Sequence, residues 1–180
     1  MRCVIGIDLS LRATGVAIWT PPIELDHKEV LPSAIELFLL EAKSTDMERL
    51  DGIFRQIKEL VKDDTALVLI EGLAFMSTSG KASERAGLWW MVAYWLWKRK
   101  QPYVAVAPSR AKKYLTGKGN AKKDEILKEV YRRYRADLTD DNLADALNLC
   151  HIGLAVEGHE RTTTQHQAEV VGILRGELDK

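Results

Sequence analysis

Three acidic side chains interrupt apolar stretches of this chain. Asp8 ends an apolar run, Glu71 directly follows another at residues 66–70, and Asp145 lies among leucines and alanines. A carboxylate in apolar surroundings is costly unless it is paired or bound to a cation. We therefore expect the three acids to meet at a divalent metal ion.

The types of these side chains indicate which ion they would bind. Asp141 lies one helical turn before Asp145 and adds a fourth carboxylate on the same helix face. No histidine or cysteine cluster stands at ligand spacing, and oxygen-only ligation favours Mg²⁺ or Mn²⁺ over Zn²⁺. Two such ions about 4 Å apart can activate a water and stabilise the leaving oxygen during phosphodiester cleavage. We therefore predict two ions held by Asp8, Glu71, Asp141 and Asp145.

Each acid also has a plain structural explanation when it is taken alone. Asp8 could be a turn acid, Glu71 a charge at a strand end, and Asp140, Asp141 or Asn142 the N-cap of the following helix. Capping cannot explain Asp145, because this residue lies inside the predicted helix. The shared pattern therefore favours the metal site over three separate explanations.

Basic residues are concentrated in one segment, although the formal net charge of the chain is zero. Residues 98–135 hold 13 of the 26 lysines and arginines but only three acids. Such a segment is either a solvated helix face or a surface that binds a phosphate backbone.

The elements that position these residues follow from the hydrophobic pattern. A hairpin is predicted at residues 3–8 and 15–19, and a strand at 35–40. A capping box at residues 45–48 begins an amphipathic helix that reaches residue 61. Further strands are predicted at 66–70 and 102–107, and helices at 82–100, from 108, and at 121–135, 141–157 and 165–178. Strands that alternate with helices after an opening meander indicate an α/β layered domain.

Ten consecutive apolar or aromatic residues run from Leu88 to Trp97. This run is far shorter than the roughly 20 residues that span a bilayer, so we expect no membrane span. A helix that is apolar on all sides must be covered on more than one side. We expect one face to pack on the sheet and the other to form a homodimer; the alternative is that every aromatic ring fills the core.

Length and composition set the remaining expectations. The 180 residues suit one domain, residues 1–180, with a hydrophobic core. Asp8 interrupts the apolar N-terminus and no cleavage-site pattern follows it, so we expect no signal peptide and a cytoplasmic protein. Cys3 and Cys150 lie in apolar patterns that favour reduced, buried thiols.

Four stretches, GIDLSLRATG, LIEG, GKGNAKK and DDNLADAL, occur in this order and carry a family resemblance. Over roughly residues 4–154 the chain resembles the RuvC-type Holliday junction resolvases of the RNase H-like superfamily. The resemblance implies a five-stranded mixed sheet, with an antiparallel meander and then parallel strands, flanked by helices on both faces. It also implies a homodimeric, metal-dependent endonuclease that cuts symmetric strands of a four-way DNA junction to leave 5′-phosphates, in a bacterial cell or a phage-infected host.

The family acids correspond to residues of this chain one by one. Asp8 matches the acid of the first motif, Glu71 the acid that ends the fourth strand, and Asp145 the helical acid before Ala-Leu. The fourth family acid would fall on Asn142, so either this residue or the adjacent Asp141 completes the site. The resemblance implies that Asp8 bridges two metal ions while Glu71 and Asp145 each hold one.

The basic segment also matches the family. A lysine on the short helix, a Gly-x-Gly loop and a lysine that opens the next helix contact phosphates in the family, and Lys123 or Lys112 would stabilise charge on the phosphate during cleavage. An aromatic after the strand-four acid inserts at the junction in the family. Phe75 is the candidate here, although it lies one residue further on and could instead pack in the core. The predicted DNA-binding residues are Lys112, Lys113, Lys118, Asn120, Lys122 and Phe75, with Lys123 among the catalytic residues.

Other function classes stay open at this point. The DLSLRATG turn also resembles the phosphate loop of actin-like ATPases and sugar kinases, but 180 residues do not supply their two lobes. A broader endonuclease for flaps and forks, and a non-catalytic junction-binding relative, both retain the same basic surface. The three matching acids favour the nuclease.

Overall fold

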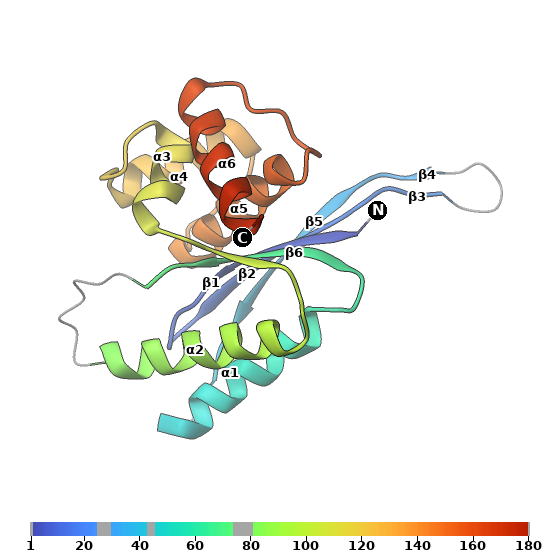
Figure 1. Ribbon diagram of the computed structural model, residues 1–180. Helices are drawn as coiled ribbons and strands as arrows, with labels where there is room; N and C mark the ends of the chain where they lie inside the picture. Colours follow the sequence, from blue (N-terminus) through green and yellow to red (C-terminus); the bar gives the residue numbers. More distant parts are fainter. Residues whose placement is uncertain (1, 25–29, 43–45, 74–80, 180) are drawn as a thin grey trace.

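A five-stranded mixed sheet runs through the centre of the molecule in the order β5–β2–β1–β6–β7 (Figure 1). The structure, a computed structural model, describes residues 2–24, 30–42, 46–73 and 81–179. Strands β5, β2 and β1 pair antiparallel, whereas β1, β6 and β7 pair parallel. The predicted α/β fold with an antiparallel meander and then parallel strands is therefore confirmed. The strands are β1 (Cys3–Asp8), β2 (Thr14–Thr20), β5 (Ala34–Leu40), β6 (Thr65–Glu71) and β7 (Tyr103–Val106).

Helices cover both faces of this sheet (Figure 1). Two lie on one face: α1 (Asp46–Leu60) and α2 (Ala82–Lys98). On the other face α5 packs directly on β1 and β2, and α3, α4 and α6 surround it. The helices of this second layer are α3 (Pro108–Thr116), α4 (Lys123–Tyr134), α5 (Asp141–Val156) and α6 (Gln165–Leu178).

The alternation of side chains along β1 and β6 decides where their last residues point. Ile5 and Ile7 of β1 belong to the core under α1 and α2, whereas Val4 belongs to the core under α5. Successive strand residues face opposite sides of a sheet, so Asp8 faces the α5 layer with Val4. The same parity on β6 puts Glu71 on the α5 side.

The predicted elements are found with shifts of a few residues at their ends. One pair of short strands was not predicted: β3 (Ile23–Glu24) and β4 (Val30–Leu31) form a separate two-stranded ribbon that projects beyond the main sheet (Figure 1). Strands of two residues are too short to produce an alternating pattern. The first residue of the predicted capping box, Thr45, lies outside the described residues. Cys3 and Cys150 are free thiols, as predicted, but only Cys150 is buried; Cys3, at the start of β1, is partly exposed.

Helix α2, which contains the apolar and aromatic run, is covered on one side only. Leu88, Val92 and Leu96 are fully buried against the sheet. Trp90 and Trp97 lie on the outer side and are 63% and 64% exposed. The alternative that every aromatic ring of this helix fills the core is therefore wrong. Within the described ranges, no helix is long and apolar enough to cross a membrane.

Candidate active site

Asp8 ends β1 and is almost fully buried, with 7% of its surface exposed. The turn that follows is closed by Thr14: its hydroxyl accepts a hydrogen bond from the Ser10 amide at 3.1 Å and donates one to the Ser10 carbonyl at 2.8 Å. These two bonds satisfy the polar groups of a buried side chain. The turn DLSLRAT therefore fixes Asp8 at the carboxyl end of β1, the central strand of the sheet.

Glu71 ends β6, the parallel neighbour of β1, so the two acids stand at adjacent strand ends. The Glu71 carbonyl accepts a hydrogen bond from the indole Nε1 of Trp89 at 2.9 Å. This bond ties the end of β6 to α2 and fixes the backbone that carries the acid.

Asp145 reaches the same place from α5, which crosses the sheet at very short range. A β-carbon at Gly6 would lie 2.3 Å from the carbonyl oxygen of Ala146, so only glycine lets the helix approach β1 so closely. Asp145 lies one residue before this contact. The helix therefore delivers its acid to the ends of β1 and β6.

The three acids are electrostatically coupled. Burial, and then the charge and hydrogen bond of Glu71, raise the pKa of Asp8 to about 8. Burial followed by the charge of Asp8 raises the pKa of Asp145 to about 7. Burial also raises the pKa of Glu71, although its interaction with Asp8 partly opposes this increase. Acids this close resist full ionisation unless positive charge is added.

Cations from three elements surround the acids. The positive charges partly oppose the increase in pKa that burial causes. Lys112 on α3 has this effect on Glu71 and Asp145, and Arg85 on α2 has it on Asp8 and Glu71. Lys123, the first residue of α4, lines the same pocket. These groups can hold an anion against the acids.

Three polar residues at the start of α5, Asp140, Asp141 and Asn142, make different contacts. Asp140 is the N-cap, since its carboxylate accepts a hydrogen bond from the Leu143 amide at 3.0 Å. Asp141 forms an ion pair with Lys123. Asn142 lines the pocket together with Asp8 and Glu71. Asp141 therefore does not cap the helix, and both Asp141 and Asn142 remain candidates for the fourth metal ligand.

Asp8 and Glu71 line a pocket of about 370 Å³. The strand ends supply its acids, α2 supplies Arg85 and Trp89, and Lys123 and Asn142 close the opposite wall. The pocket is therefore built from five segments of the sequence: the ends of β1 and β6, and residues of α2, α4 and α5.

The chemistry of the donors fits hard divalent cations, because the acids offer oxygen ligands and their mutual repulsion would be relieved by positive charge. In the present arrangement, however, no group of three acid, histidine or cysteine side chains within the described residues is spaced to hold a metal ion. Positive charge supplied by a bound cation would allow the neighbouring acids to ionise together.

The predicted DNA-binding residues lie in different surroundings. Lys112 is beside the acids, and Lys118, Asn120 and Lys122 are exposed near the start of α4. Lys113 forms an ion pair with Glu169 of α6 at 2.8 Å. A second pair, Arg110 with Glu177 at 2.7 Å, also joins α3 to α6, which docks the predicted C-terminal helix on the body. Phe75 lies outside the described residues.

Sequence reasoning missed Arg85 and Trp89. Both precede or belong to the aromatic run of α2, where the apolar pattern dominated the interpretation. Arg85 is the one cation between Glu84 and Lys98 in this helix, and that isolation was the available signal. The hydrogen bond from Trp89 to a backbone carbonyl left no trace in the sequence.

Solved structures share this fold. No protein-family model and no curated protein matches the chain. RuvC of Thermus thermophilus matches with a TM-score of 0.63 at 21% identity, over 87% of this chain and 96% of that one. A structure of T. thermophilus RuvC in complex with Holliday junction substrate gives 0.66 at 20% identity, over 88% and 97%. The Fowlpox virus resolvase with its substrate Holliday junction DNA gives 0.50 at 13% identity, over 87% and 99%. These similarities confirm the predicted RuvC-like fold.

Proposed function

We propose that this chain is a RuvC-type endonuclease that cuts four-way DNA junctions with divalent metal ions. The observation that carries the proposal is the electrostatic coupling of Asp8, Glu71 and Asp145, with Lys112 and Lys123 close enough to affect them. Asp8 and Glu71 also line one pocket together with Lys123. The chain shares its fold with two resolvases whose structures contain junction DNA.

Each acid has a distinct place in this proposal. Asp8, Glu71 and Asp145 hold Mg²⁺ or Mn²⁺, with Asp141 or Asn142 as the fourth ligand. The bound cations supply Lewis-acid stabilisation of charge on the phosphate and on the leaving oxygen. Asp8 is buried and Glu71 and Asp145 are partly buried, which strengthens their attraction to a cation.

The surrounding cations position the substrate. Lys112, Lys123 and Arg85 reach the acids from three different helices, so a phosphodiester in the pocket contacts positive charge on several sides. Such preorganised charge stabilises the transition state more than the substrate, because negative charge increases during the displacement. Water is the nucleophile of this displacement: it adds to phosphorus while the bond from phosphorus to the 3′ oxygen breaks. The products are a 3′-hydroxyl and the 5′-phosphate end that the resemblance implies.

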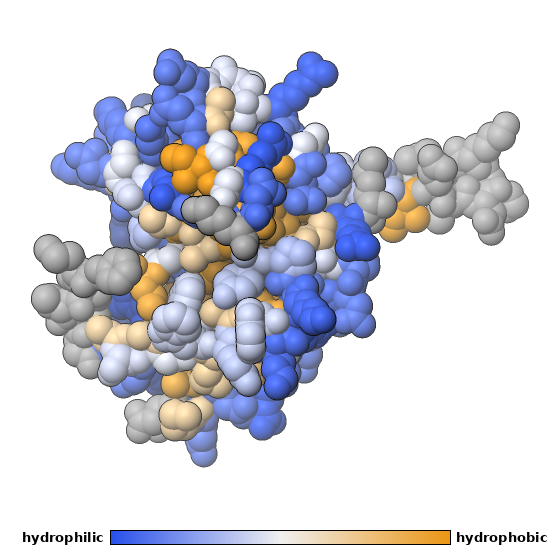
Figure 2. Space-filling model, in the orientation of Figure 1, coloured by the Kyte–Doolittle hydropathy of each residue, from blue (hydrophilic) through white to orange (hydrophobic). Residues whose placement is uncertain are grey.

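Symmetric cleavage of a junction needs two such sites, and α2 offers a surface for a second copy of the chain. Trp90, Tyr94 and Trp97 are exposed on its outer side, and Tyr94 also lines an apolar hollow with Phe54 and Met91. Figure 2 shows pale and orange side chains over α2 and saturated blue around them. We therefore place the homodimer contact on this face.

The function is tested by cleavage of end-labelled DNA. A mobile four-way junction, a flap and a linear duplex of matched sequence are incubated with Mg²⁺, Mn²⁺ or a chelator. Wild type is compared with Asp8→Asn and with Asp63→Asn, a matched control whose side chain is 98% exposed near Arg99.

We expect paired symmetric nicks in the junction alone, which disappear with the chelator and in Asp8→Asn but persist in Asp63→Asn. Equal cutting of flaps would keep the nuclease and widen the substrate to branched DNA. Tight junction binding without cutting in either metal would contradict the proposed chemistry and favour a non-catalytic relative.

A further inference from the structure

A second polar cavity, of about 500 Å³, lies among α4, α5, α6 and the segment that joins α5 to α6. Its described walls hold three arginines, Arg132, Arg133 and Arg161, against a single acid, Glu160. None of these residues takes part in the candidate active site. The cavity therefore carries an excess of positive charge that the proposed cleavage chemistry does not use.

The acid of this cavity is already engaged. Glu160 accepts a hydrogen bond from Nδ1 of His151 at 2.6 Å. The His151 ring is stacked on Tyr134, with the ring centres 3.6 Å apart and the planes within 2° of parallel. Glu160 is therefore held by His151, and among the described residues it forms no ion pair with the three arginines.

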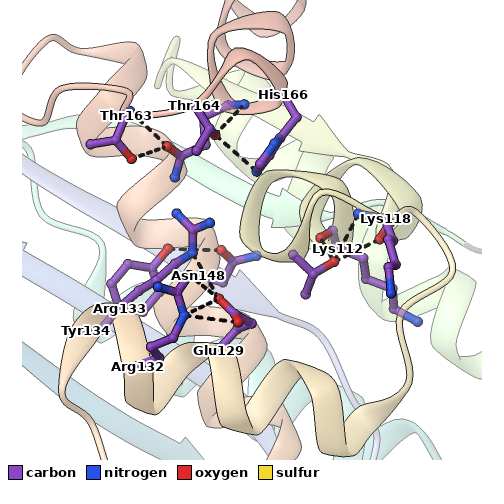
Figure 3. A network of polar contacts seen from close by, with 12 residues as sticks. Lys112, Lys118, Glu129, Arg132, Arg133, Tyr134, Asn148, Thr163, Thr164 and His166 are labelled. Atoms are coloured by element: carbon purple, nitrogen blue, oxygen red, sulfur yellow. Dashed lines mark hydrogen bonds and ion pairs between the residues drawn. The ribbon is translucent and has the colours of Figure 1, made fainter.

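Two of the three arginines are held in place by an acid, and the arginines retain donors without a partner among the described residues. Glu129 accepts hydrogen bonds from Nε and Nη2 of Arg132 and from Nε of Arg133. The two terminal nitrogens of Arg133 have no hydrogen-bond partner among the described residues, and they point away from Glu129 toward the segment with Thr163 (Figure 3). Arg161 likewise forms no ion pair within the described part of the chain.

These donors suit a phosphate group. The planar guanidinium fork matches phosphate oxygens, and Arg133 is oriented in advance by Glu129. Helix α6 begins at this cavity with Thr164 as its N-cap, so its first amides add partial positive charge beside the arginines. Cavity, oriented arginines and helix terminus therefore favour the same ligand.

Helix α4 connects this cavity to the candidate active site. Lys123 at its first residue lines the pocket of acids, and Arg132 lies nine residues further on, about 14 Å along the helix at about 1.5 Å per residue. Lys118 and Lys128 line a further hollow along α4, together with Glu125 and Glu129. At an axial rise of about 3.4 Å per base pair, the length of α4 between these residues corresponds to about four base pairs of a duplex arm lying alongside the helix.

We propose that the cavity of Arg132, Arg133 and Arg161 binds a backbone phosphate of a junction arm, about four nucleotides from the cut. This inference rests on the proposed nuclease function and extends its DNA contact along α4. Because a phosphate carries no base identity, the site fixes the direction of the arm and adds no sequence preference.

The test measures binding of fluorescent junctions by anisotropy as a function of salt, in an Asp8→Asn background that prevents cleavage. Arg161→Gln is compared with Arg55→Gln, an exposed arginine on α1 across the sheet. Junctions carry single neutral methylphosphonates at positions two to seven from the cut. We expect Arg161→Gln to weaken binding and to lower the salt slope by about one, and Arg55→Gln to leave both unchanged.

The methylphosphonate near position four should weaken binding by the Asp8→Asn protein and have no further effect with Arg161→Gln, because both changes remove the same contact. Arg161→Lys should retain most of the salt slope. Additive losses of binding from the two changes, or an unchanged salt slope in Arg161→Gln, would overturn the inference. Junction cleavage by wild type would in that case still support the proposed function.

A free anion is the other source of this chemistry, and inorganic phosphate is the probe for it. Thermal stabilisation by phosphate that depends on Arg161, together with junction binding that does not, would assign the cavity to a free anion and overturn the DNA contact. If wild type neither binds nor cuts branched DNA, the proposed function itself fails, and the DNA contact fails with it.

Discussion

A methyl group on Gly15 would lie 2.1 Å from the carbonyl oxygen of Asn142, closer than unbonded heavy atoms approach. Gly15 pairs with Asp8 across the β1–β2 ladder, and Asn142 belongs to the first turn of α5. The missing side chain lets α5 lie directly on the strand that neighbours Asp8. This contact sets the position of Asp145, one turn further along the helix.

Gly15→Ala should therefore separate the acids. We expect the free energy of unfolding to fall by about 1–3 kcal/mol, as for other overpacked sites, and cleavage of the junction to fall by a much larger factor. Urea unfolding and single-turnover cleavage measure the two effects. Gly172→Ala is the control, since nothing lies within 4 Å of its added methyl; this helix position should gain up to about 1 kcal/mol. Full activity in Gly15→Ala would contradict the role of this contact.

The pKa values of the acids predict how metal-free stability depends on pH. The pKa of Asp8 is raised to about 8 by burial and Glu71, and that of Asp145 to about 7 by burial and Asp8. Both exceed the value of about 4 in an unfolded chain, so between these values the folded state binds more protons than the unfolded state. Their contribution is complete below about pH 4 and is lost as the pH rises through 7 and 8. Unfolding with a chelator at pH 5.5, 7 and 8.5 should show this decline.

Asp8→Asn should reverse part of that decline, because a neutral amide removes one of the repelling charges. At pH 8.5 without metal we expect a higher melting temperature than wild type, by about 2–4 °C for each kcal/mol gained. Mg²⁺ should stabilise wild type more at pH 8.5 than at pH 5.5, since binding requires deprotonated acids, and should have little effect on the variant. A less stable Asp8→Asn under these conditions would argue against mutual repulsion of the acids.

Much of the fold and of the acid site follows from local patterns. Asp8 and Glu71 stand at the ends of strongly apolar strands, so their positions could be predicted from periodicity alone. Asp145 stood out because a polar residue inside an apolar helix face has few explanations. In each case the signal lies within a few residues of the site.

The features that were not predicted depend on contacts between distant segments. Arg85 and Trp89 reach the pocket only because α2 starts beside the end of β6. The pairing of Lys113 with Glu169 joins residues 56 positions apart, and no local pattern specifies it. The cavity of Arg132, Arg133 and Arg161 likewise forms only where α4 meets the start of α6.

Two adjacent lysines at the start of α4 should differ in function. Both side chains are exposed, but Lys123 lines the pocket and pairs with Asp141, whereas Lys122 is not among the residues that line the pocket. The backbone amide of Lys122, which a change of side chain keeps, donates a hydrogen bond to Glu125 at 3.2 Å. Lys123→Gln should lower the single-turnover rate at saturating junction by about 100-fold or more, in the range found for one lost charge-stabilising donor. Lys122→Gln should keep that rate and lower the salt slope of binding by about one. Equal effects of the two substitutions on the rate would contradict a catalytic place for Lys123.

The outer face of α2 predicts the effect of charge on self-association. Trp90→Glu with Trp97→Glu places two carboxylates where we propose that two copies meet, and an unpaired charge is costly in a desolvated contact. Sedimentation should show a dimer for wild type and a monomer for the double variant. Both side chains are more than half exposed, so the monomer should stay folded. Met47→Glu, on α1 and 69% exposed in wild type, is the control that should remain dimeric. The monomeric variant should also lose paired nicks in the junction, because the two cuts need two sites held together. A double variant that remains a dimer with paired cuts would move the contact away from α2.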